Sequence, residues 1–196
     1  MSDITRRDAL TYLAAAFASA ATIDHWLARE VHAQVRAGAA AGTASPALST
    51  QQLRTLERLV DLVIPVENGK PGALAAGVPA WIDALVKVNP DLQARYAAGL
   101  AWLDTTMTAT TGTDFANATP AAQTALLDVI AFREGRTTEN ATGVDFFVLA
   151  RRMIVDGYYT SDIGIRDINP GGRPPLSAFV VPQEAIDYVI SRSPFK

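Results

Sequence analysis

The stretch from Ser49 to Pro65 constrains the fold most, because it carries all the signals of one amphipathic helix. Ser49 and Gln52 have the spacing of a capping box, in which each side chain bonds to the backbone N–H of the other residue. Pro65 ends the segment, since proline cannot continue a helix interior. Between them, apolar residues recur every three or four positions: Leu53, Leu56, Leu59, Val60, Val63 and Ile64. Such a helix needs partners to cover its apolar face, so we expect a fold built by packing helices together.

Later segments repeat this helical period and start at similar signals. Further helices are expected after Pro79, from Asp91 to about Ala109, after Thr119-Pro120, from around Gly143 to Gly157, and after Pro182. No run of useful length alternates between apolar and polar residues, so no strand is expected. The sequence therefore predicts an all-α fold, with one compact domain of about five to six helices over residues 49–196.

The first 33 residues have the layout of an export signal. Arg6 and Arg7 precede an uncharged run of fifteen residues, and a polar tail follows that ends in Val31-His32-Ala33, with a cleavage site expected after Ala33. Paired arginines favour the twin-arginine route, which exports folded proteins. The same segment also has apolar residues at helical spacing, so a retained amphipathic helix is the alternative. Residues 34–48 are rich in small residues and are expected to form a linker. The uncharged run is shorter than the roughly 20 residues that cross a bilayer, so no membrane span is expected.

The stretch from Thr160 to Val181 is the second unusual segment. Its glycines and prolines predict a long irregular arm, and long loops of this kind often bind partners. Tyr158 and Tyr159 border the arm, and they either cover the core or contribute to an interface. The candidate partner interface predicted from these features comprises Tyr158, Tyr159, Arg166, Pro170, Arg173, Pro174, Pro175 and Phe179.

Composition excludes several kinds of chemistry. The chain has no Cys, which excludes thiol catalysis, disulfides, iron–sulfur clusters and covalently attached haem. Its two histidines, His25 and His32, both lie within residues 1–33, so a processed chain would lack His-based catalysis and His metal ligands. A metal pair formed by these two on a retained helix is the alternative. There is no glycine-rich nucleotide motif, so no catalytic residue, metal or cofactor is assigned to this chain.

Charged residues give no further site. The formal net charge is -3 at pH 7, which argues against nucleic acid as a partner. Asp61, Asp83, Asp104 and Asp128 are all expected on the solvent faces of their helices, rather than in an acid–base pair.

A series of spaced segments stands out in the chain: Ile64-Pro65, Gly69-Lys70-Pro71-Gly72-Ala73, Ala76-Gly77-Val78-Pro79, Ile82-Asp83, Tyr96, Gly99-Leu100, Leu103-Asp104, Phe115, Thr119-Pro120, Phe146-Phe147 and Gly157-Tyr158-Tyr159-Thr160-Ser161. In this order they resemble the gluconate 2-dehydrogenase subunit 3 family, and the resemblance covers roughly Ser49 to Ser161. It implies a small subunit without a cofactor of its own, whose partner is an FAD-containing catalytic subunit of the glucose–methanol–choline class. That partner would oxidise a sugar, a sugar acid or a glycoside in the periplasm and could pass electrons to a cytochrome c subunit. The resemblance also implies that the leader exports the folded pair by the twin-arginine route.

Two other classes of function remain open from the residues alone. A stand-alone exported helical module could bind a partner unrelated to redox chemistry. A cofactor-free helical enzyme could use Tyr158, Tyr159 and a carboxylate, and activity of the purified chain alone would identify it.

Overall fold

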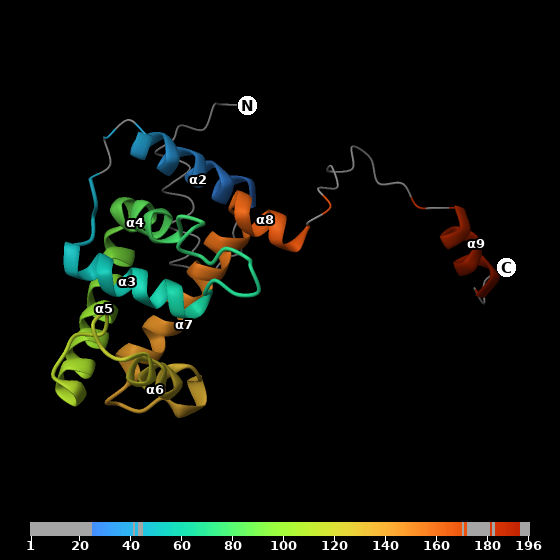
Figure 1. The fold of residues 1–196 in the computed structure, drawn as a ribbon. Helices are drawn as coiled ribbons and strands as arrows, with labels where there is room; N and C mark the ends of the chain where they lie inside the picture. Colours follow the sequence, from blue (N-terminus) through green and yellow to red (C-terminus); the bar gives the residue numbers. More distant parts are fainter. Residues whose placement is uncertain are drawn as a thin grey trace.

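The computed structural model describes residues 25–40, 42, 45–169, 171, 181 and 183–192. This part of the chain is all-α and contains eight α-helices, one short 3₁₀ helix and no strand (Figure 1). The elements are α2 (His25–Ala40), α3 (Thr50–Val63), α4 (Val78–Val88), α5 (Pro90–Thr111), α6 (Pro120–Ile130), η1 (Arg133–Gly135), α7 (Ala141–Tyr159), α8 (Asp162–Ile168) and α9 (Gln183–Arg192).

The predicted helix starts are confirmed where a capping residue marks them. Ser49 and Gln52 form the complete capping box of α3. Asn89 caps α5 and Thr119 caps α6, and in both helices a proline occupies the first turn. These side chains accept hydrogen bonds from backbone N–H groups that have no partner inside the helix, which fixes where each helix begins.

The expected number of about five to six helices is too low, because one helix was expected only as an alternative to an export signal and another was not expected at all. The first is α2, whose last turns include Val35 to Ala40, a stretch expected to belong to a linker. Alanine is the strongest helix former, so an alanine-rich stretch also suits a helix end. The second is α8, which lies inside the predicted irregular arm. In addition, α7 continues through Gly157 to Tyr159.

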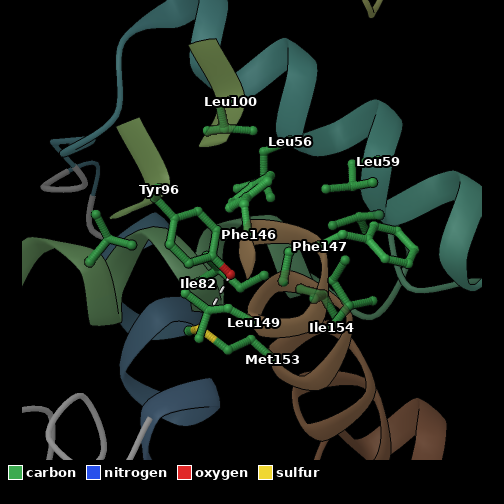
Figure 2. Close-up of a cluster of buried hydrophobic side chains, with 14 of the residues drawn as sticks. Leu56, Leu59, Ile82, Tyr96, Leu100, Phe146, Phe147, Leu149, Met153 and Ile154 are labelled. Carbon is green, nitrogen blue, oxygen red and sulfur yellow. Dashed lines mark hydrogen bonds between the residues drawn. The ribbon is translucent and has the colours of Figure 1, made fainter. Parts of the chain in front are cut away.

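The core lies between α7 and the helices α3, α4 and α5. Figure 2 shows how the side chains from these helices meet: Leu56 and Leu59 of α3, Ile82 of α4, Tyr96 and Leu100 of α5, and Phe146, Phe147, Leu149, Met153 and Ile154 of α7. The hydroxyl of the buried Tyr96 donates to the Met153 Sδ over 3.2 Å. These apolar faces are the ones that the helical period predicts, and their burial supplies the main driving force for folding.

One glycine sets how closely α5 and α7 approach. A Cβ added at Gly99 would lie 2.6 Å from the Phe146 Cβ and closer still to the ring atoms Cγ and Cδ2. The ring of Phe146 also meets the ring of Tyr96 edge to face, with centroids 5.4 Å apart. Gly99 therefore makes the space in which the Phe146 ring packs.

The two flanking helices differ in how they relate to this core. α2 packs on α4 and buries Ala28 and Val31 completely. By contrast, α9 has no buried residue and stands apart from the other helices in Figure 1. Among the described residues, no helix combines the length and apolar character that crossing a bilayer requires.

Candidate partner-binding surface

Tyr158 and Tyr159 end α7 and have different environments. Tyr158 is buried, and its hydroxyl donates to the carbonyl of Pro71 over 3.0 Å. Burial raises the pKa of this hydroxyl, with the nearby Asp167 carboxylate acting in the same direction. Tyr159 packs edge to face on Tyr158 but stays 38% exposed. The sequence left open whether the two tyrosines cover the core or contribute to an interface. Tyr158 belongs to the core, whereas Tyr159 has exposed area available to a partner.

The helix α8 folds back against the end of α7. The side chain of Ser161 accepts from the N–H of Gly164 over 3.0 Å and donates to the carbonyl of Tyr158 over 2.6 Å. A Cβ at Gly164 would meet that same carbonyl oxygen and lie 2.6 Å from the Tyr158 carbonyl carbon. The absence of a side chain at Gly164 thus permits the sharp turn from α7 into α8.

An ion pair connects α8 to the loop before α4. The Lys70 Nζ lies 2.6 Å from Asp167 Oδ1, and this hydrogen bond raises the pKa of Lys70. The loop of residues 65–72 also makes the short pairing of Glu67 with Lys70 through two backbone hydrogen bonds. The loop, the end of α7 and α8 thereby form one surface, which we call the α8 surface.

The segments that form the α8 surface expose both apolar and charged side chains. Val66 is 71% exposed and Ile168 is 65% exposed. They come from the two segments that the Lys70–Asp167 pair connects, and the exposed Arg166 belongs to the same helix as Ile168. A mixture of aromatic, apolar and arginine side chains is typical of the central part of a protein interface. Sequence reasoning identified Tyr159 and Arg166, but nothing in the apolar period indicated Val66, Lys70, Asp167 or Ile168.

The other residues predicted for the interface cannot be placed. Pro170, Arg173, Pro174, Pro175 and Phe179 lie outside the described residues, as do Arg6 and Arg7 of the predicted export signal. Their roles stay predictions.

Two carboxylates expected on solvent faces have structural roles instead, so that expectation was wrong for them. Asp83 of α4 accepts hydrogen bonds from the N–H groups of Ala47 and Leu48 over 3.0 and 2.9 Å. It therefore holds the segment that leads into α3. Asp61 pairs with Arg58 of its own helix, and Asp128 is exposed, as expected.

Asp104 of α5 is the second of these carboxylates. It accepts from the hydroxyl of the buried Thr55 over 2.9 Å, from the Gln51 side chain over 3.2 Å and from the N–H of Phe115 over 3.2 Å. Asp104 thus connects α3, α5 and the loop before α6. The chain segments that bond to Asp83 and Asp104 come from other parts of the sequence. The apolar period of a single helix cannot predict such contacts.

His32 of α2 is a buried packing residue. Its Nε2 donates to the carbonyl of Gly157 over 2.8 Å, and its ring stacks on Trp81 with centroids 5.5 Å apart. Burial lowers its pKa, so the neutral form is favoured.

A shallow pocket of about 270 Å³ lies beside His32, lined by Arg29, Glu30, His32, Ala33, Arg36, Thr160 and Asp162. Both signs of charge line this pocket, and Arg36 pairs with Asp162 over 3.1 Å. Within the described part of the chain, no three His, Asp or Glu side chains gather as metal ligands.

Comparison with known proteins gives one match. The model of the family described as gluconate 2-dehydrogenase subunit 3 matches residues 50–171. This range begins with α3 and runs past α8, so it includes the α8 surface and leaves α2 and α9 outside. No curated protein and no solved structure matches the chain.

Proposed function

Because the chain belongs to the gluconate 2-dehydrogenase subunit 3 family, we propose that it is the non-catalytic small subunit of a heteromeric dehydrogenase. The family is that of a subunit of the gluconate 2-dehydrogenase complex, which implies other dehydrogenase subunits as partners. In our proposal the catalytic subunit is of the glucose–methanol–choline class, holds FAD and oxidises a sugar, a sugar acid or a glycoside. A cytochrome c subunit could receive the electrons. This chain itself holds no cofactor and stabilises the catalytic subunit.

The observation that carries the proposal is the family match, which covers α3 to α8. The way in which the chain uses its polar groups supports the proposal. Asp83, Asp104, His32 and Tyr158 all bond to other parts of the same chain, and these bonds connect loops and helices. These side chains therefore hold the fold together. The part of the chain that can bind another protein is its exposed surface.

We place the contact with the catalytic subunit on the α8 surface and on the segment that follows it. Tyr159, Ile168 and Arg166 supply exposed aromatic, apolar and charged area at the end of α7 and on α8. Pro170, Arg173, Pro174, Pro175 and Phe179 continue the chain directly from α8. A proline-rich segment loses little conformational entropy when it binds, which favours a docking role.

Export completes the proposal. Arg6 and Arg7 would direct the folded complex through the twin-arginine route to the periplasm, so that one signal serves two subunits. Replacing both arginines by lysine should then hold the dehydrogenase activity in the cytoplasmic fraction. Unchanged periplasmic activity would contradict the export role and leave the subunit role intact.

The subunit role is tested by expressing the catalytic subunit with and without this chain. We expect soluble, FAD-loaded, dye-reducing activity only when the chain is present. A chain that ends at Asn169 lacks the proposed docking segment and α9, which has no buried residue, and it should recover less catalytic subunit. Equal activity with and without the chain would refute the proposal, and dehydrogenase activity of the purified chain alone would show that it is an enzyme.

A further inference from the structure

The helix α2 lies across the cleavage site that the sequence suggests. Ala33, the last residue of the expected signal, is in the middle of the helix, which runs without interruption from His25 to Ala40. We propose that α2 is a permanent element of the mature subunit and that signal processing takes place ahead of residue 25. This inference rests on the proposed export of the chain only for the processing step.

The first half of α2 contributes to the core of the domain. Ala28 and Val31 are completely buried on α4, and the buried His32 stacks on Trp81. The indole N–H of Trp81 donates to the carbonyl of Ala28 over 3.2 Å. Trp81 is among the largest completely buried side chains of the domain. Cleavage after Ala33 would therefore remove the residues that cover it.

The contacts of α2 extend to two further helices. His32 donates to the carbonyl of Gly157 in α7, and the Thr160 hydroxyl lies 3.3 Å from the same ring nitrogen. Arg36 pairs with Asp162 in α8 over 3.1 Å. α2 is thus held by α4, α7 and α8 together. A segment that serves only as an export signal does not need such contacts.

The order of events on the export route supports the same conclusion. Twin-arginine export moves proteins that are already folded, so a signal peptidase would meet α2 after it has packed. A peptidase acts on an accessible segment and not on a packed helix. The sequence also has small residues, Ala18-Ser19-Ala20, ahead of α2. Cleavage there would leave every described contact of α2 in place.

The first test does not depend on export. The chain is made in the cytoplasm with its first residue at Ala21 or at Gln34, and thermal unfolding is followed by circular dichroism. We expect the longer chain to melt within about 2 °C of the full chain and the shorter one to melt more than about 10 °C lower or to aggregate. Equal melting temperatures of the two chains would overturn the proposal.

A matched pair of substitutions keeps the test sharp in the full chain. Val31→Asp places a charge in the core, whereas Ala33→Asp changes an exposed position of the same helix. In the purified complex with the catalytic subunit, only the first should lower the melting temperature. If Val31→Asp leaves the mature complex unchanged, α2 is not part of it, and the proposal fails.

Mass spectrometry of the exported subunit tests the processing step. A first residue at or before His25 supports the proposal, and Gln34 as first residue overturns it. A chain found intact in the cytoplasm would contradict the proposed export but support the retention of α2. The two proposals can therefore fail separately.

Discussion

Gly99→Ala tests the close packing of α5 on α7. The added Cβ would lie 2.6 Å from the Phe146 Cβ and closer to its ring, where an ordinary contact is 3.4–4 Å. Phe146 is only 4% exposed and is enclosed by the core, so it cannot swing into solvent. Overpacking of this kind costs up to about 3 kcal/mol. The better helix propensity of alanine offsets about 1 kcal/mol of that cost. The net loss of about 2 kcal/mol should lower the melting temperature by about 4–8 °C.

The matched control is Gly38→Ala in α2, where an added Cβ would meet nothing within 4 Å. This substitution should leave stability unchanged or raise it by up to about 1 kcal/mol. Both variants are measured by thermal and urea unfolding followed by circular dichroism. In a Phe146→Ala background, the penalty of Gly99→Ala should shrink by about 1 kcal/mol or more, because the ring atoms are gone. A Gly99→Ala protein that melts at or above the temperature of the unmodified chain would refute the packing argument.

Two further predictions concern polar groups of the domain. Burial lowers the pKa of His32 below 6.5, so the unfolded chain binds a proton more readily than the folded one. The stability linked to His32 is therefore present above pH 6.5 and is lost as the pH falls through the lowered folded value. The melting temperature of the unmodified chain should decrease from pH 7.5 to pH 5, and that of His32→Gln should decrease less. An equal decrease in the two proteins would argue against the contribution of His32. Asp104→Ala should cost about 2–3 kcal/mol in urea unfolding, because it leaves the buried Thr55 hydroxyl without its acceptor. Asp61→Ala, which breaks only a partly exposed ion pair, should cost at most about 1 kcal/mol, and similar losses in both would contradict the role of Asp104.

The helices with strong local signals could be predicted from the sequence. Ser49, Asn89 and Thr119 each mark a helix start, because capping chemistry acts within three residues. The apolar faces of these helices could be predicted as well, since the helical period and burial have one physical cause.

Contacts between distant segments could not be predicted in this way. Asp83 and Asp104 point away from the main apolar stripes of their helices, and only the tertiary fold brings residues 47–48 and 115 over them. α8 has seven residues and contains Gly164, so it shows too few turns for a helical period. For the α8 surface, the tyrosine pair was a usable signal, whereas the pairing of Lys70 with Asp167 joins residues far apart in the sequence.

The most direct test of the proposed subunit role is to purify the complex through an affinity tag on this chain after coexpression with the catalytic subunit. Native mass spectrometry then identifies what is bound, and the flavin absorbance gives the FAD content of the same sample. We expect the catalytic subunit to elute with the tagged chain and to carry the FAD. A tagged chain that elutes alone, while an active FAD-containing dehydrogenase is found without it, would contradict the proposal.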